Sequence, residues 1–184
     1  MRSLDELKSA LANYQINRDY RDEILGFRCC ELAFTALEDN CYGVGALLCD
    51  GAGQILVEGR NEVFKNGFHS DRHAEMVVLN VFEGQFKTYG DRSQLTVMVS
   101  LEPCPMCFTR MLIAGIGRVV YLAEDRGGGM IHKQDKMSDL WRNLAQLQSQ
   151  HRAEVTTVLS SIASELGQCR IDLLRQRLLA AIRA

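Results

Sequence analysis

Both prolines of the 184-residue chain flank a single cysteine, in the segment Pro103-Cys104-Pro105. The segment lies between the apolar run QLTVMVSL, residues 94–101, and a helix-like pattern over residues 103–115. A short apolar run bounded by turn residues is consistent with a strand buried on both faces. Proline is tolerated in the first turn of a helix, because its missing N–H has no intrahelical partner there. We therefore expect a stiff turn that leads from a buried strand directly into a helix.

Helical and strand patterns alternate along the rest of the chain. Ser3 and Glu6 have the spacing of a capping box at a helix start. Asp50-Gly-Ala-Gly53 is typical of the turn of a β-hairpin. Ser70 or Asp71 is the expected N-cap of the helix that starts at His73. Predicted helices cover residues 3–15, 18–39, 73–82, 103–115, 138–149 and 161–183, and predicted strands cover 43–50, 53–61, 94–101, 118–124 and 154–158.

This order of elements predicts an α/β fold. The strands alternate with helices after the first hairpin, which implies parallel crossover connections and helices on both faces of one sheet. The chain shows no internal repeat, low-complexity segment or linker. We expect a single domain over residues 1–184, with the helices 3–15 and 161–183 as additions to it.

Composition and charge argue against several classes of function, although they do not exclude a local basic patch. The net charge is −2, so there is no overall basic excess of the kind that nucleic-acid-binding domains show. The N-terminal residues lack the apolar stretch of a secretory signal, and no apolar run is long enough to span a membrane. The expected location is cytoplasmic, where thiols stay reduced. Five of the seven cysteines are therefore expected to be small buried apolar residues: Cys29, Cys30, Cys41, Cys49 and Cys169.

Cys104 and Cys107 differ from the others because they form a C-x-x-C pair at a helix start. The free N–H groups and dipole of a helix N-terminus favour thiolates. The chain has no second C-x-x-C to close a four-cysteine site, but it has His73-Ala74-Glu75, which begins 31 residues upstream of Cys104 at another predicted helix start. One histidine and two cysteines would leave one open position on a zinc ion, as in catalytic sites. Alone, the cysteine pair could instead be a redox motif or two buried cysteines.

Glu75 completes the pattern. It lies two residues after His73, where its carboxyl group can enter the same pocket without binding the metal. Zinc makes hydroxide available from water near neutral pH, and a nearby carboxylate can carry protons between that water and a substrate. The combination H-x-E with P-C-x-x-C is the signature of zinc-dependent nucleobase deaminases.

The sequence resembles the cytidine/deoxycytidylate deaminase superfamily, and within it the branch of guanine deaminases, cytosine deaminases and tRNA adenosine deaminases. The segments that carry the resemblance are HAE (73–75), EPCPMC (102–107), IGRVVYLAED (116–125), Val44-Gly-Ala-Leu and Gly59-Arg-Asn61. The resemblance implies a three-layer α/β/α fold with a five-stranded mixed sheet whose last two strands are parallel. The sequence departs from the family pattern in two segments, FHSDR (68–72) and EDRGGGMIHKQDKMSDLW (124–141).

The resemblance also implies roles for individual residues. His73, Cys104 and Cys107 would bind Zn²⁺, and Glu75 would transfer protons. The residues implied to hold the substrate base are Asn61, the backbone of Ala74, Ser100 and Leu101, and Asp125. Asn61 could equally be a turn residue, and Asp125 a loop charge. A homodimer is implied as well.

The expected function is zinc-dependent hydrolytic deamination of a small nucleobase-like heterocycle, of the guanine or cytosine type, with release of ammonia. One alternative is a tRNA adenosine-to-inosine deaminase, which the negative net charge does not favour. Another is a non-catalytic, zinc-stabilised scaffold. Substitution of Glu75 separates these cases, because a scaffold would not depend on that carboxylate.

Overall fold

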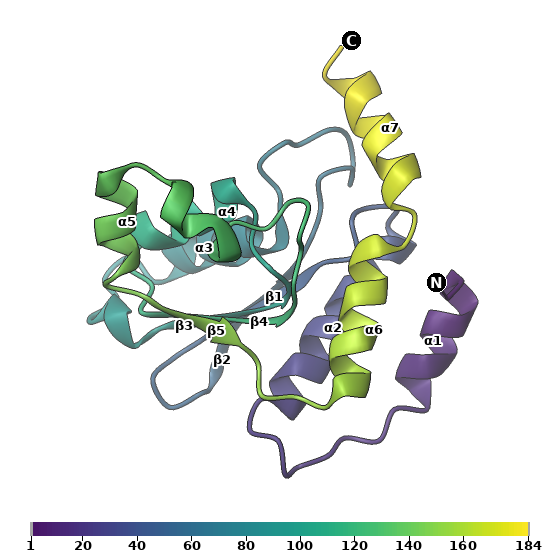
Figure 1. The fold of residues 1–184 in the computed structure, drawn as a ribbon, viewed down its shortest axis with the longest axis horizontal. Helices are drawn as coiled ribbons and strands as arrows, with labels where there is room; N and C mark the ends of the chain where they lie inside the picture. The colour runs from purple at the N-terminus through teal and green to yellow at the C-terminus, as the bar shows by residue number, and fades with distance from the viewer. Residues whose placement is uncertain (1, 184) are drawn as a thin grey trace.

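The structure is a computed structural model, which describes residues 2–183, and its centre is a five-stranded sheet (Figure 1). The strands are β1 (Gly45–Cys49), β2 (Ile55–Arg60), β3 (Thr96–Leu101), β4 (Arg118–Ala123) and β5 (Ser149–Arg152). Their order across the sheet is β2-β1-β3-β4-β5. Strand β1 is antiparallel to β2 and β3, whereas β3, β4 and β5 are parallel. The predicted mixed sheet, with its last two strands parallel, is confirmed.

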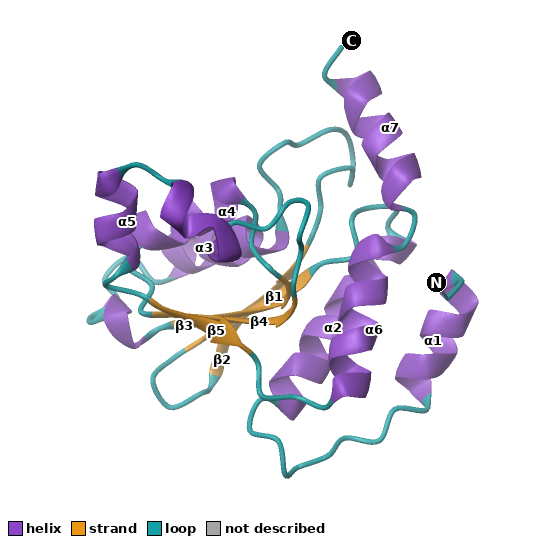
Figure 2. Cartoon of the chain, viewed as in Figure 1, coloured by secondary structure: helices purple, strands orange, loops and turns teal. Residues whose placement is uncertain are grey.

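Helices cover both faces of this sheet, so the predicted three-layer α/β/α arrangement is also confirmed (Figure 2). The helices are α1 (Leu4–Ala12), α2 (Glu23–Glu38), α3 (Ala74–Gln85), α4 (Pro105–Ile113), α5 (Asp139–Ala145), α6 (Thr157–Gln168) and α7 (Ile171–Ala181). Helices α1, α2 and α6 lie on one side of the sheet, and α3, α4 and α5 lie on the other. None of the helices that the structure describes is long and apolar enough to cross a membrane.

The strands supply side chains alternately to two hydrophobic cores. In β1, Leu47 packs on the α2 and α6 side, whereas Leu48 packs on the α3 and α4 side. In β4, Val120 packs on the α2 and α6 side, and Val119 packs on the α3 and α4 side. All four side chains are almost fully buried, which explains why the central strands read as continuous apolar runs rather than as alternating ones.

Two local predictions are confirmed. Ser3 and Glu6 form the capping box of α1: the Ser3 N–H donates to Glu6 Oε2 at 2.6 Å, and the Glu6 N–H donates to Ser3 Oγ at 3.3 Å. Strands β1 and β2 form the predicted antiparallel hairpin, whose turn is closed by the Asp50 N–H donating to the Gln54 carbonyl at 2.9 Å. Gly53 has φ 81° in this turn, a conformation that favours glycine.

The position predicted for the last strand is wrong. Residues 154–158 do not form a strand; β5 lies earlier, at Ser149–Arg152, where Ser149 pairs with Arg118 of β4. The Thr156 side chain accepts a hydrogen bond from the Leu159 N–H at 3.1 Å, and this cap starts α6 at Thr157. The cap at Thr156 therefore starts a helix within a segment whose composition is typical of a strand.

The prediction of a single helix over residues 161–183 is also wrong, because the helix is interrupted at Cys169 and Arg170. Arg170 has φ 57° in the left-handed region, and α7 starts after it in a new direction. The apolar periodicity continues across the break, so it does not reveal the bend. Helix α3 also differs from expectation at its start, since its N-cap is His73 itself rather than Ser70 or Asp71.

Candidate active site

The N-termini of α3 and α4 face one another at one edge of the sheet. Cys104 is the N-cap of α4 and Pro105 occupies its first turn, so the stiff strand-to-helix turn expected from the prolines is present. His73 is the N-cap of α3. Each cap residue has an extended backbone, which directs its side chain away from its own helix and toward the other.

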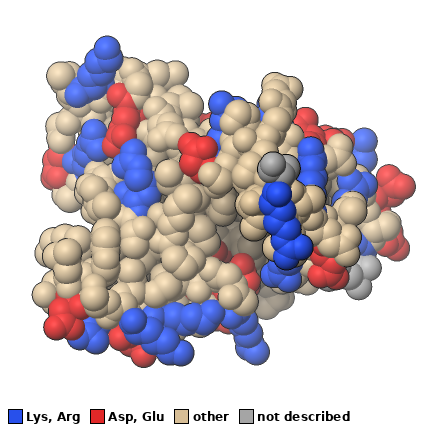
Figure 3. All heavy atoms as spheres, turned by 90° about the horizontal axis from the view of Figure 1, so that it is seen from above, with Lys and Arg blue, Asp and Glu red and all other residues tan. Residues whose placement is uncertain are grey.

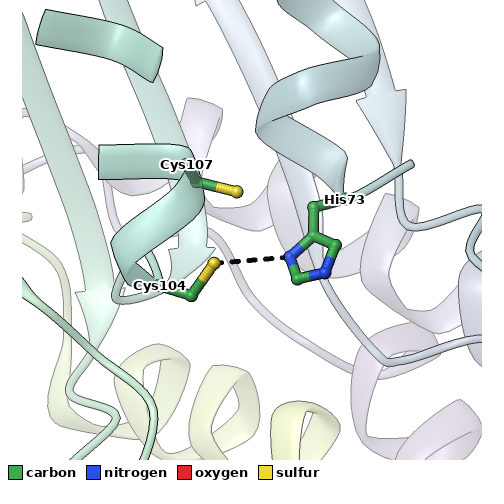
Figure 4. A group of neighbouring side chains, drawn as sticks. All are labelled: His73, Cys104 and Cys107. Atoms are coloured by element: carbon green, nitrogen blue, oxygen red, sulfur yellow. Dashed lines mark hydrogen bonds between the residues drawn. The ribbon is translucent and has the colours of Figure 1, made fainter. Parts of the chain in front are cut away.

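The three predicted zinc donors meet in this space. The side chains of His73, Cys104 and Cys107 point toward one another (Figure 4), and their donor atoms all lie within 4.8 Å of each other. His73 Nδ1 is 3.6 Å from Cys104 Sγ. Two sulfurs and one imidazole nitrogen are preferred zinc donors, and a set of three leaves a fourth tetrahedral position open. The residues present therefore fit a zinc ion.

The electrostatics of the cluster favour a thiolate at Cys104, whereas the contact with Cys104 and burial raise the pKa of the Cys107 thiol. The contact with Cys107, helped by His73, lowers the pKa of Cys104 to about 4, although burial opposes this shift. Burial is the largest single influence on the pKa of His73 and acts to lower it, but the Cys104 sulfur, together with the carboxylates of Glu75 and Asp71, raises that pKa above its ordinary value. Cys104 is therefore a thiolate at neutral pH, which is the form that binds metal.

Glu75 lies in the first turn of α3, and only 3% of its surface is exposed. Burial raises the pKa of its carboxyl group, and the neighbouring Cys104 sulfur raises it further. A raised carboxyl pKa brings proton exchange closer to neutral pH, which suits a general acid and base. Glu75 thus lies in the same site as the three donors.

A cavity of about 390 Å³ opens beside this cluster, a size typical of small-molecule sites. His73, Glu75 and Cys104 form part of its wall. Six of the other lining side chains are apolar: Tyr42, Val44, Val63, Leu101, Ile171 and Leu178. Polar or charged side chains also line the cavity: Ser70, Glu102, Asp125, Gln168 and Arg175. The wall therefore combines apolar area with polar groups on several sides.

The structure places the predicted substrate-binding residues in two groups. Leu101 and Asp125 line the cavity directly. Asn61, Ala74 and Ser100 are buried and do not line it, although the chain neighbours His73 and Leu101 of the last two do. Asn61 Oδ1 accepts a hydrogen bond from the Val63 N–H at 3.1 Å, and Ser100 Oγ accepts one from the Gly45 N–H at 3.1 Å.

Sequence reasoning missed the contribution of α7. This helix and the residues before it place Gln168, Ile171, Arg175 and Leu178 along the cavity. Helix α7 is held against the body by Arg177, whose guanidinium lies 4.2 Å from the centre of the Phe64 ring and donates to the Asn40 carbonyl at 3.1 Å. A periodicity that reads as one long helix gives no signal for this placement.

Sequence reasoning also missed Glu102, although that residue lies within the segment EPCPMC (102–107). Its side chain is completely buried and is hydrogen-bonded to His132, from a segment that had no assigned role. The glutamate next to the cysteine motif was the available signal.

Comparison with known proteins identifies the family. Residues 21–123, more than half of the chain, match the family described as the cytidine and deoxycytidylate deaminase zinc-binding region. The chain is 33% identical over 143 residues to a tRNA(Ile)-lysidine synthase from Deinococcus radiodurans, a match that covers 77% of this chain. The chain spans only about a quarter, 24%, of the length of that relative.

Two further similarities cover most of the length of the other protein. The chain is 31% identical over 125 residues to a tRNA-specific adenosine deaminase from Haemophilus influenzae, covering 68% of this chain and 66% of that protein. A solved structure of a guanine deaminase from Nitrosomonas europaea superposes with a TM-score of 0.63 at 19% identity, covering 89% of this chain and 93% of the other. The second likeness shows a shared fold. Since the matched region also contains the His73, Cys104 and Cys107 cluster, the chain belongs to the cytidine and deoxycytidylate deaminase family, whose cofactor is zinc.

Proposed function

We propose that this protein is a zinc-dependent hydrolase that deaminates a nucleobase or a related small heterocycle, of the guanine or cytosine type. The observation that carries the proposal is the position of Glu75. Its buried carboxyl group lines the same small cavity as His73 and Cys104, and the set of three donors that these two form with Cys107 would leave one zinc coordination position open. A structural zinc site would use four protein ligands and would need no such carboxyl group.

In this proposal His73, Cys104 and Cys107 hold the metal. When bound, zinc supplies Lewis-acid activation of a water molecule near neutral pH. Glu75 takes a proton from that water and delivers it to a ring nitrogen of the substrate. The water oxygen bonds to the amino-bearing ring carbon, the carbon–nitrogen bond breaks, and ammonia leaves with a second proton carried by Glu75.

The other proposed roles concern substrate binding. Leu101 and the backbone of Ala74 and Ser100 would contact the base, and Asn61 and Asp125 would hydrogen-bond its polar edge. The apolar walls from Val44, Val63 and α7 favour a flat heterocycle of limited size.

Ammonia release tests the proposal. The zinc-loaded protein would be assayed against guanine, cytosine, adenine, their nucleosides and nucleotides, pterins and aminotriazines. We expect release from one of the free heterocycles and a loss of at least about hundredfold in E75Q, the range for removal of a general acid and base. E83Q is the matched control, because Glu83 lies on the same helix and pairs with Arg92 and Arg110 rather than lining the cavity. Equal activity in E75Q and wild type would exclude this mechanism.

A tRNA adenosine deaminase is a second candidate, favoured by the similarity to the Haemophilus influenzae protein. The surface charge gives it little support: on the face shown in Figure 3, Lys and Arg side chains are interspersed with Asp and Glu and separated by broad uncharged areas. RNA-binding grooves usually carry a continuous basic path. Ammonia release from tRNA alone, with binding that weakens steeply as salt rises, would establish this candidate instead.

We also propose a homodimer. Large apolar side chains are exposed at the end of α4, in α5 and just after α5: Ile113 is 67% exposed, Leu140 64% and Leu147 80%. Burial of such side chains against a second copy would remove them from water. Light scattering would measure the mass, and I113D should shift it toward the monomer, whereas V158D, at an exposed residue of α6 on the opposite side of the sheet, should not.

A further inference from the structure

Glu102 is a completely buried carboxylate with no lysine or arginine partner among the described residues. It follows the last residue of β3 and precedes the turn that carries Cys104. Its side chain is 0% exposed, and among the described residues its carboxylate is hydrogen-bonded to none of the three zinc donors His73, Cys104 and Cys107. A buried carboxylate is costly unless hydrogen bonds satisfy it, so its partners show what it does.

All of these partners come from one segment, residues 125–132. The Asp125 N–H donates to Glu102 Oε2 at 3.1 Å, and the His132 N–H donates to Oε1 at 2.9 Å. The His132 ring adds Nδ1, which lies 2.7 Å from Oε1 and 2.9 Å from Oε2. The carboxylate therefore ties the beginning and the end of this segment to a single point.

The segment closes tightly around that point. The Gly129 N–H donates to the Asp125 carbonyl at 2.7 Å, and the Met130 N–H donates to the Pro103 carbonyl at 2.9 Å. A methyl group at Gly129 would lie 2.5 Å from the Glu102 carboxyl carbon, so only glycine fits beside the carboxylate. Three successive glycines are costly to order; their N–H groups donate to Asp125, whose own N–H donates to the buried carboxylate.

This segment also forms a wall of the cavity. Asp125, Gly128 and Glu102 all line it, and Asp125 Oδ1 is held in place by the N–H groups of Gly127 and Gly128 at 3.1 and 3.0 Å. We propose that Glu102 and His132 are positioning residues that fix the segment 125–132 as the substrate-facing wall. The kinetic part of this inference rests on the proposed function.

The first test uses hydrogen exchange and needs no substrate. E102Q keeps the size of the side chain but replaces one acceptor oxygen with an NH₂ group, which would face N–H donors of the segment. We expect the amides of Asp125 and His132 to exchange at least about tenfold faster in E102Q. E124Q is the control, because Glu124 is a neighbouring carboxylate with a half-exposed side chain and no hydrogen bond to the segment's backbone. Exchange rates that agree within about twofold would overturn the proposal.

A second pair of variants tests the same wall while Glu102 and the three zinc donors keep their identity. In G129A the new methyl group would collide with the Glu102 carboxyl group, whereas in G127A it would lie 3.6 Å from Asp125 Oδ1, an ordinary contact. We expect G129A to reproduce the faster exchange of E102Q while zinc content stays at the wild-type value. G127A should resemble wild type.

Kinetics then separate positioning from general structural support. On the substrate found in the ammonia assay, E102Q, H132A and G129A should each raise KM at least about tenfold and change kcat by less than about threefold. H132N, whose side-chain N–H can replace Nδ1–H, should recover part of the loss. Faster exchange with unchanged KM would overturn the role in substrate binding. Absence of turnover by the wild-type protein would instead reject the proposed function, and the exchange results would still show whether Glu102 holds the segment.

Discussion

His73 Nδ1 and Cys104 Sγ lie 3.6 Å apart although 31 residues separate them in the sequence. Each residue is the N-cap of its own helix, and the sheet brings the two helix starts together. The contact therefore depends on the tertiary fold, while the capacity of each group to bind metal is local.

This relationship predicts that zinc and folding are coupled. Wild-type protein should bind one zinc per chain and gain thermal stability when zinc is added, because a ligand that binds only the folded state stabilises it. C107S should lose both the bound metal and the gain in Tm. C49S is the control, because Cys49 is buried in the core on the other side of the sheet and should keep full zinc content. Stoichiometric zinc in C107S would contradict the assignment.

A second prediction concerns stability in acid. Arg110, helped by Arg92, holds the pKa of Glu83 below its ordinary value of 4.5, against a smaller opposing effect of burial. A carboxylate with a lowered folded-state pKa contributes stability above the unfolded-state value, and that contribution disappears as pH falls through the folded-state value. E83Q should therefore unfold about 0.5–1 kcal/mol more easily near pH 7, the range for a partly exposed ion pair.

Urea unfolding at several pH values would measure this effect. The difference between wild type and E83Q should shrink as pH falls below 4.5, the ordinary glutamate value, and through the lowered folded-state pKa. E38Q is the control, since Glu38 Oε1 lies 3.9 Å from Lys8 Nζ at an exposed position and should show a smaller effect near neutral pH. A difference that is constant with pH would argue against the ion pair.

A third prediction compares two glycines. A methyl group at Gly117 would lie 1.7 Å from the Ser93 carbonyl oxygen, so G117A must shift the backbone before β4 and should destabilise the protein by about 3 kcal/mol. Gly84 is exposed near the end of α3, and nothing lies within 4 Å of the methyl position. G84A should stabilise the protein by about 0.5 kcal/mol, because alanine favours helix. Thermal denaturation of both variants would check the opposite signs.

A fourth prediction concerns α7. R177A removes the contact with the Phe64 ring and the hydrogen bond to Asn40, so α7 should pack less firmly beside the cavity. We expect KM to rise severalfold, with little change in kcat. Q176A, at the exposed neighbouring residue, provides the comparison. If R177A and Q176A have the same KM, the position of α7 does not affect substrate binding.

Much of the fold could be predicted because its signals are local. The capping box at Ser3, the hairpin at Asp50 and the apolar runs of β3 and β4 each follow from neighbouring residues. The errors occurred where tertiary contacts override local preference. Residues 154–158 have strand-like composition, but β4 pairs with the earlier residues 149–152 instead.

The sequence by itself determined the chemistry of the donor cluster. The ability of a thiolate or an imidazole to bind metal is a property of the side chain itself, and the prolines around Cys104 restrict the turn through covalent geometry alone. Only the tertiary structure decided the shape of the cavity. The bend at Arg170 brings α7 to the cavity, and the partners of Glu102 come from residues 23 to 30 positions away in the chain. Such contacts depend on how distant segments pack together, and no local pattern of residues specifies that packing.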